Sequence, residues 1–193
     1  TQVRAGDAAL LVPCVAVMSA PIEKHRLEHS WCLWVLLRDQ STTDEWQGSQ
    51  MNVREMAYVE DFWRVYRNIK TPSVLGFVDF SFFKKGVAPA REDDSCRPGG
   101  RLIARLANLK PEVLDELWLT IMLTLMGENW QAAGGAHILG AVVGARRQGS
   151  SKVALWLSER AEAKVRPLGE AFLGLLRTNC AVDVVNFENF GTA

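Results

Sequence analysis

A predicted hairpin in the last third of the chain places an aromatic ring and basic groups where they could hold a nucleotide. Successive side chains of a strand point to opposite faces, so Lys152 and Trp156 share one face of the segment 152–157. They should lie about 13 Å apart, the reach of a base and its phosphates. Arg146 and Arg147 at the tip add planar guanidinium groups that match phosphate oxygens. The same residues also fit a solvated loop with an incidental Trp.

Three consecutive acidic residues, Glu92, Asp93 and Asp94, follow Arg91 in a long predicted loop. An ionised carboxylate can accept both N1–H and N2–H from a guanine edge, a paired contact that only guanine among the common bases offers. An acidic run in a loop is also commonly solvated surface. Guanine recognition is therefore one of two interpretations open for this run.

The segment His25-Arg26-Leu27-Glu28-His29 matches H-x-x-E-H, in which two histidines on one helical face bind zinc and the glutamate acts as base. We interpret this match as a coincidence, because the segment runs directly into a predicted strand and no convincing third ligand follows. Four glycines form neither G-x-G-x-x-G nor a P-loop: Gly134, Gly135, Gly140 and Gly144. Since no nucleophile triad is found either, the sequence predicts no enzymatic centre, no metal site and no cofactor.

Composition excludes several classes of protein. Lys and Arg number 22 and Asp and Glu number 22, which excludes a strongly basic nucleic-acid coat and an acidic disordered tail. No apolar run approaches the roughly 20 residues that cross a bilayer, so we expect no membrane partner. With 7 Trp against 2 Tyr, most indoles should pack in the core and some should face a ligand. The cysteines lack metal-ligand spacing and are predicted to be free thiols: Cys14, Cys32, Cys96 and Cys180.

The elements that must position these groups are paired strands with single helices between them. Strand character occurs over 31–37, 77–83, 102–106, 137–143, 152–157 and 182–187, and helical spacing over 59–69, 111–125 and 161–176. Pro111 suits the first position of its helix, whereas Pro167 lies inside the third helix, where we expect a break or kink. Residues 84–100 should form a long loop. This order predicts an α+β fold with helices packed on one face of a sheet.

The chain divides into a tail, residues 1–21, and one domain, residues 22–193. A chain of 193 residues with 48% hydrophobic residues can bury one substantial core. Residues 8–18 are apolar, but Asp7 and Pro13 argue against a secretory signal. We expect a cytoplasmic monomer, with the nucleus as a second compartment.

A series of motifs then follows in one order between about residues 25 and 160. The motifs are Trp31-Cys32-Leu33-Trp34, Val59-Glu60-Asp61-Phe62-Trp63 with Trp46 upstream, Asp79-Phe80-Ser81-Phe82-Phe83-Lys84-Lys85-Gly86-Val87-Ala88-Pro89, Gly99-Gly100-Arg101, Leu117-Trp118-Leu119 with Gly127-Glu128, Gly140-Ala141-Val142-Val143, and Lys152-Val153-Ala154-Leu155-Trp156. With these motifs in this order, the chain resembles the eukaryotic translation initiation factor 4E family, whose members bind the 7-methylguanosine cap of messenger RNA. The resemblance implies a curved antiparallel sheet of about eight strands, with three helices packed on the convex face and the cap on the concave side.

The resemblance also implies roles for single residues. Trp46 corresponds to one of two indoles that sandwich the methylated base, Glu92 to the carboxylate that pairs with its N1 and N2 edge, and Trp156 to the residue that touches the methyl group. Arg146 and Lys152 correspond to phosphate ligands, although one extra residue between them leaves Arg147 as an equal match for the arginine. The N7-methylated base is cationic, so an indole attracts it by stacking and by a cation–π interaction, and the stacking is worth about 1 to 3 kcal/mol.

The chain departs from the family at Arg91, where the second stacking Trp should stand. A guanidinium plane can stack on a base, but it brings positive charge toward a cationic one. Arg91 could instead turn toward phosphates or downstream nucleotides, or leave one stacking face only. We therefore expect weaker cap binding than in members with two Trp. Leu102 also replaces a Trp after Gly-Gly-Arg, and both changes fit a divergent paralogue, for example from a protist.

On the convex side the family binds the scaffold initiation factor 4G and inhibitory proteins through a helix with a Tyr-x4-Leu-apolar motif. The matching residues here are His25, Val59, Trp63, Leu119, Leu123 and Gly127. Arg26 replaces the family's Pro, and Thr120 replaces its acidic residue. The resemblance thus predicts a non-enzymatic cap-binding protein of translation initiation, with capped mRNA and factor 4G as partners. The alternative is an adaptor or translational repressor with weak or lost cap binding that acts through this convex surface.

Overall fold

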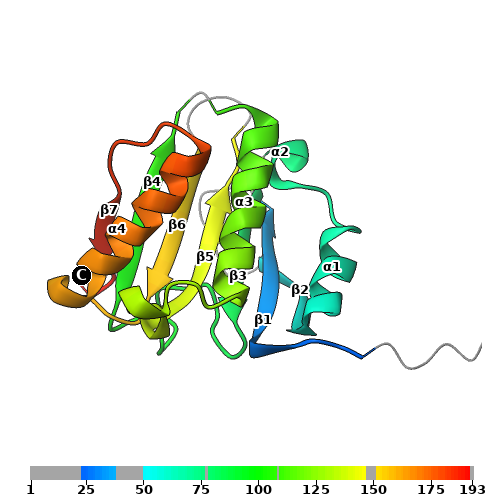
Figure 1. The fold of residues 1–193 in the computed structure, drawn as a ribbon, viewed down its shortest axis with the longest axis horizontal. Helices are drawn as coiled ribbons and strands as arrows, with labels where there is room; N and C mark the ends of the chain where they lie inside the picture. The colour runs from blue at the N-terminus through cyan, green and yellow to red at the C-terminus, as the bar shows by residue number, and fades with distance from the viewer. Residues whose placement is uncertain (1–22, 38–49, 77, 108, 147–150, 192–193) are drawn as a thin grey trace, which may run out of the picture.

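The computed structural model describes residues 23–37, 50–76, 78–107, 109–146 and 151–191. Its elements in chain order are β1 (Arg26–Leu37), β2 (Gln50–Tyr58), α1 (Val59–Tyr66), α2 (Pro72–Leu75), β3 (Val78–Lys84), β4 (Gly100–Leu106), α3 (Pro111–Met126), two 3-10 turns (Gln131–Ala133 and Gly135–His137), β5 (Ile138–Gly144), β6 (Ser151–Leu157), α4 (Glu162–Asn179) and β7 (Asn186–Asn189) (Figure 1).

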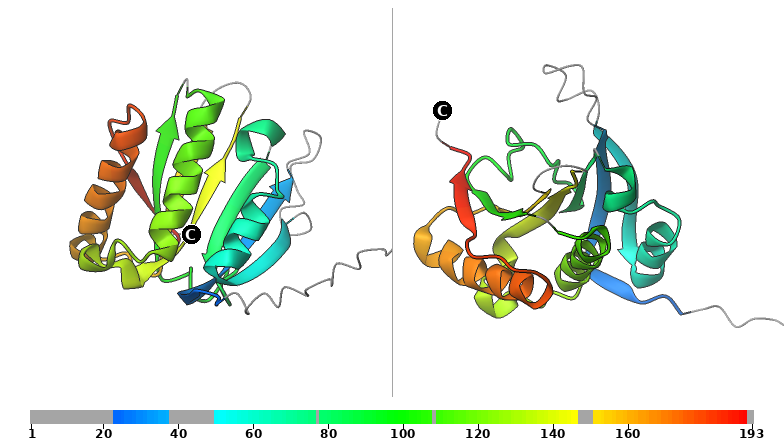
Figure 2. Two further views of the ribbon diagram at one scale, coloured as in Figure 1. Left: turned by 45° about the vertical axis from the view of Figure 1, so that its right-hand side comes forward. Right: turned by 90° about the horizontal axis from the view of Figure 1, so that it is seen from above.

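The strands form a single antiparallel sheet with the helices on one side. Its strand order is β2-β1-β3-β5-β6-β4-β7, a 7-stranded sheet within the described residues, against the eight or so expected. Figure 2 shows α3 and α4 lying against one face of the curved sheet, which leaves the other face without helices. The predicted α+β fold is confirmed. A fourth helix, α2, is added because Pro72 begins a single helical turn that Gly76 ends with a φ of 76°.

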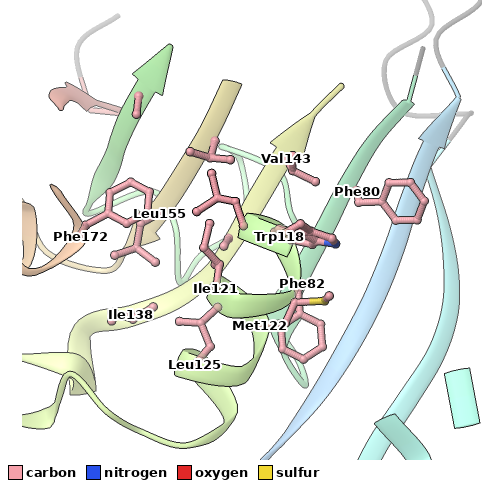
Figure 3. Close-up of a cluster of buried hydrophobic side chains, with 14 of the residues drawn as sticks. Phe80, Phe82, Trp118, Ile121, Met122, Leu125, Ile138, Val143, Leu155 and Phe172 are labelled. Carbon is pink, nitrogen blue, oxygen red and sulfur yellow. The ribbon is translucent and has the colours of Figure 1, made fainter. Parts of the chain in front are cut away.

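The main core lies between the sheet and the helices. Trp31 of β1 stacks on Phe82 of β3, with ring centroids 4.9 Å apart and planes 5° apart. From α3, Trp118 and Ile121 point into the same layer, and α4 contributes Phe172 (Figure 3). Each side chain of this size stabilises the fold by about 1.5 to 3 kcal/mol when it is fully buried. The helices are therefore held by their apolar faces, which is the pattern that the sequence predicted.

The face away from the helices carries a second, smaller cluster. Its buried members are Phe83, Cys96, Ile103, Leu139, Ala154 and Trp156. Alternation along β6 separates the two layers, because Val153 and Leu155 belong to the core under the helices whereas Ala154 and Trp156 face the other way. The predicted two-faced character of this strand is confirmed.

Strand β2 was not predicted. Its sequence, Gln-Met-Asn-Val-Arg-Glu-Met-Ala-Tyr, has no clean alternation, and only Met56 is buried. β2 lies at the edge of the sheet and pairs only with β1, so one backbone edge and most of its side chains face solvent. A strand held by pairing rather than by burial gives little signal in its sequence.

Two predictions in the C-terminal third were wrong. Helix α4 runs unbroken through Pro167, because this residue lies in the second turn and removes one hydrogen bond while Val165, Leu168 and Phe172 anchor the helix on both sides. The last strand is Asn186–Asn189 rather than 182–187. Its position is set by pairing with Gly100–Ile103 of β4, which the sequence of the segment alone does not reveal.

Several predictions fall outside the described residues. They concern the tail, residues 1–21, together with Cys14, Trp46 and Arg147. Among the described helices, none is both long and apolar enough to span a bilayer.

Candidate functional site

A row of residues crosses the helix-free, concave face at Trp156. Strand register aligns Phe83 of β3, Gly140 of β5, Trp156 of β6 and Arg101 of β4. A Cβ on Gly140 would lie 2.5 Å from Cγ of Phe83, so the glycine leaves the space in which the two rings meet, with centroids 5.4 Å apart. In the sequence this glycine is recognisable only as one that fits no phosphate-binding loop, and its role as a gap between aromatic neighbours was not predicted.

A second row lies four residues along the same strands. Asp79 of β3, Gly144 of β5 and Lys152 of β6 are neighbours in register. A Cβ on Gly144 would lie 2.7 Å from Oδ1 of Asp79 and 2.9 Å from Cε of Lys152, so both side chains occupy the space above the glycine. Nη1 of Arg146 donates to Oδ1 of Asp79 at 3.0 Å.

The structure therefore brings the predicted pair Arg146 and Lys152 together over a carboxylate that the sequence analysis missed. Asp79 is only 4% exposed, and its partner Arg146 is 23% exposed, so the ion pair is largely shielded from solvent. A single acidic residue inside a mainly apolar strand was the available signal. This end of the face is basic, and its geometry is fixed by backbone pairing.

The three acidic residues of the loop 85–99 make different contacts. The Asp93 carboxylate accepts hydrogen bonds from the backbone N–H groups of Ala88, at 3.0 Å, and Ser95, at 2.9 Å, and so holds the loop in shape. Asp94 forms an ion pair with Arg97 at 3.1 Å. The Glu92 carboxylate is exposed and has no partner among the described residues. Of the three carboxylates, only that of Glu92 has no contact with another group among the described residues.

Arg91 contacts the C-terminal segment. Its Nη2 lies 3.7 Å from Oε2 of Glu188, and its Cζ lies 5.4 Å from the ring centroid of Phe190. Phe190 also packs on Trp156, with ring centroids 4.6 Å apart. Glu188 and Phe190 were missed in the sequence, because only the pairing of β7 with β4 brings them to this face.

The described cysteines, Cys32, Cys96 and Cys180, are free thiols as predicted. Burial, followed by the charges of Asp93 and Glu92, raises the pKa of Cys96 to about 12. Its thiol therefore stays protonated at neutral pH and packs under the loop as an apolar group.

The H-x-x-E-H segment does not build a zinc site. It leads into β1, where extended backbone separates residues four apart by about 13 Å instead of stacking them on one helical face. Nδ1 of His25 lies 2.7 Å from Glu60, and Nδ1 of His29 lies 2.8 Å from Glu128, so each ring has its own acidic partner. Across the described ranges, no group of three or more potential metal ligands occurs.

Comparison with known proteins gives a consistent result. The family model described as eukaryotic initiation factor 4E matches residues 26–190. The chain belongs to the eukaryotic initiation factor 4E family. Initiation factor 4E1 of Drosophila melanogaster is 36% identical over 145 residues, which cover 75% of this chain and 54% of that relative. Factor 4E-1B of Danio rerio is 38% identical over 74% of this chain and 65% of its own length.

Solved structures of initiation factor 4E proteins share the fold. The C. elegans protein eIF4E-3, in complex with the 4E-binding protein Mextli, superposes with a TM-score of 0.79 at 28% identity and covers 88% of this chain and 95% of its own. The Ascaris suum protein eIF4E-3, in complex with the m2,2,7G cap, gives a TM-score of 0.76 at 30% identity, with 89% and 94% covered. The chain spans between about a half and two-thirds of the curated relatives named above.

The residues predicted for the partner surface of an initiation factor 4E lie around α1, α3 and the start of β1. Trp63 is half-buried and packs edge-on against Phe62, at 5.1 Å, so it is not a wholly buried core residue. Leu123 is 38% exposed. Val59 and Leu119 are half-buried, and His25 and Gly127 are exposed. These six residues therefore reach the surface to different degrees.

His25 is fixed by α1. Its backbone N–H and its ring both hydrogen bond to the Glu60 carboxylate, and the ring contact lowers the pKa of Glu60. The first turn of α1 thereby ties the strand entry to the helix. α1 and α3 also face a shared apolar cavity of about 20 Å³, lined by Phe62 and Tyr66 on one side and Trp118 and Met122 on the other.

Leu102, the second departure from the initiation factor 4E pattern, is buried at 3% exposure. It forms part of the floor of an open groove of about 400 Å³ between α4 and the β4–β7 edge, together with Val165, Gly169 and Phe187. A smaller residue at this position leaves space that a Trp would fill.

Proposed function

We propose that this protein binds the 7-methylguanosine cap of mRNA in translation initiation, as a non-enzymatic factor. One observation carries the proposal. The concave face joins an aromatic row at Trp156 to a basic row at Lys152, and the residues lie four apart on one strand, about 13 Å, which matches a base and its phosphates. Homologous solved structures that hold cap ligands support this ligand class.

At the base end, recognition of guanine falls to Glu92. Its carboxylate, which no described residue contacts, accepts N1–H and N2–H, and these charge-assisted bonds select guanine. Trp46 supplies a stacking indole, and Trp156 contacts the methyl group. Arg91 adds a planar cation beside the base rather than a second indole, so it contributes less cation–π attraction.

At the phosphate end, Arg146 and Lys152 bind the phosphate oxygens. Asp79 holds Arg146 by an ion pair at 3.0 Å, so the guanidinium is oriented before a ligand arrives. Nη1 also donates to the backbone carbonyl of Ala145, at 2.6 Å, which leaves Nε and Nη2 to donate to phosphate oxygens.

The partner surface is formed by His25, Val59, Trp63, Leu119, Leu123 and Gly127. We propose that it accepts an amphipathic helix of a scaffold such as factor 4G or of a 4E-binding protein. Homologous complexes with Mextli and with 4E-BP support this partner class. The protein would act as a cytoplasmic monomer, with the nucleus as a second compartment.

Titration with 7-methyl-GDP and with GDP, followed by quenching of tryptophan fluorescence, tests cap binding. We expect saturable binding with at least a tenfold preference for the methylated ligand, since only that base is cationic. Absence of saturable binding to either ligand would contradict the proposal. The Trp63→Ala variant is a control, because it lies on the opposite side of the sheet and should leave cap affinity unchanged.

A second candidate function is an adaptor or translational repressor with weak cap binding. Two observations favour this role: Arg91 contacts Glu188, and Trp156 is only 4% exposed. Both limit the access of a base to these side chains. A peptide with a Tyr-x4-Leu-apolar motif should then bind wild type and lose binding in Trp63→Ala, while 7-methyl-GDP binds to neither. If the wild-type protein does not bind the peptide, this role is excluded.

A further inference from the structure

The aromatic row of the concave face is covered by the end of the chain. β7 pairs with β4 and places Glu188 opposite Arg101. Glu188 and Phe190 are two residues apart and face the concave side, whereas Phe187 belongs to the core under the helices. The ring of Phe190 lies 4.6 Å from that of Trp156, which is left 4% exposed. An indole this enclosed offers little surface to a ligand.

Glu188 holds this end of the chain by charge. Its Oε2 accepts hydrogen bonds from Nε of Arg101, at 3.0 Å, and from Nη2, at 2.7 Å. The same oxygen lies 3.7 Å from Nη2 of Arg91. One carboxylate therefore links β4 to the loop that carries Glu92 and neutralises two guanidinium groups beside the base end.

Two features favour movement of Glu188 and Phe190 away from the concave face. The Glu188 and Arg91 side chains are 45% and 53% exposed, so this ion pair is weak, and the shorter pair with Arg101, which is 17% exposed, is the stronger hold on Glu188. Nε1 of Trp156 is buried and has no hydrogen-bond partner among the described residues. A desolvated N–H raises the free energy of the closed arrangement, and opening would let water or a ligand oxygen reach it.

We propose that Glu188 and Phe190 form a cover over the base end, which a bound cap must displace. The inference rests on the proposed function and adds to it a set of residues that controls affinity. Phe190 packs on the ring of Trp156, and Glu188 forms ion pairs with Arg101 and Arg91. The ligand therefore competes with the chain's own side chains for each of these partners.

Stopped-flow tryptophan fluorescence with 7-methyl-GDP tests the cover in the full chain. Glu188→Gln removes the charge but keeps the shape, and Phe190→Leu shortens the cover while remaining apolar. We expect each variant to raise the association rate and the affinity at least threefold. Asp183→Asn is a matched control, because it removes one exposed negative charge from the same C-terminal segment outside the cover, and Phe190→Tyr retains the ring. Both should behave as wild type.

The outcomes separate the cover from the proposed function. Weaker or unchanged binding in Glu188→Gln and Phe190→Leu, with measurable binding in wild type, would overturn the cover and leave cap binding intact. Binding in the two opened variants but not in wild type would support both. Absence of binding in wild type and in both variants would overturn the proposed function and the cover with it. Unchanged thermal unfolding in Glu188→Gln would show that its effect does not come from misfolding.

Discussion

At one end of the concave face, Asp79 and Lys152 meet over Gly144, and Arg146 joins them from the end of β5. At the other end, Glu92 and Arg91 come from the loop 85–99, and Glu188 comes from the C-terminal strand. The first end is positioned by paired strands and contains a buried carboxylate. The second combines backbone pairing of β7 with β4, which places Glu188, with contacts of the more exposed side chains of Arg91 and Glu188. Groups that pair with a buried carboxylate are thus tied to the stability of the fold, whereas groups with exposed contacts can change with less effect on it.

Glu92→Gln gives the largest expected effect on binding. The variant loses charge-assisted pairing with guanine, worth about 1.5 to 3 kcal/mol, or roughly 10- to 100-fold in affinity for 7-methyl-GDP. Thermal unfolding should not change, because the Glu92 carboxylate has no partner in the described part of the chain. Asp94→Asn is the matched control, since it removes a charge from the same loop but only breaks the ion pair with Arg97. Equal losses in both variants would mean that net charge, not pairing, is recognised.

Asp79→Ala should lower both stability and binding. It leaves Arg146 partly buried without its partner, at a cost of about 2 kcal/mol in the free energy of unfolding, and it frees the guanidinium to leave the phosphate site. We expect at least a tenfold loss in affinity for 7-methyl-GDP. Urea unfolding and fluorescence titration would measure the two effects. A loss of stability with unchanged affinity would break the proposed link between this carboxylate and phosphate binding, and Ser81→Ala on the same strand controls for loss of a buried polar group.

Arg91→Trp should tighten binding of 7-methyl-GDP by about fivefold, or roughly 1 kcal/mol, because an indole restores the second stacking face. Arg91→Ala separates this gain from release of Glu188, since it breaks that contact without adding a ring. If Arg91→Trp binds no more tightly than Arg91→Ala, then the replacement of Trp by Arg is not what limits affinity at the base end.

The carboxylate of Glu159, whose side chain is 23% exposed, contrasts with the buried Asp79, and substitution of Glu159 should have the smallest effect. A hydrogen bond from Lys164, with two backbone N–H groups at the start of α4, lowers the pKa of Glu159 from 4.5 to about 2. A lowered pKa stabilises the fold above pH 4.5, and this stabilisation is lost as the pH falls toward 2. Glu159→Gln should therefore unfold at a slightly lower temperature than wild type at pH 7. A difference that persists at pH 2 would show that charge is not its cause.

Much of the fold could be predicted from local patterns. Pro111 begins α3 as expected, and the alternation of Val153, Ala154 and Leu155 assigned the two faces of β6 correctly. β2 escaped prediction because an edge strand is held by backbone pairing, and Pro167 misled because the packing of α4 outweighs one lost hydrogen bond. The periodicity of apolar side chains indicates which residues are buried but does not indicate which strands pair.

The sequence by itself determined the chemistry that the protein can offer: a basic and aromatic strand, an acidic loop, and motifs that resemble the initiation factor 4E family. Only the tertiary structure decided which of these groups meet. It placed two glycines of β5 where neighbouring side chains need space, gave Asp93 and Glu92 different tasks, and brought Glu188 and Phe190 onto Arg91 and Trp156. The physical reason is that strand register joins residues far apart in the chain, and no local pattern encodes that register.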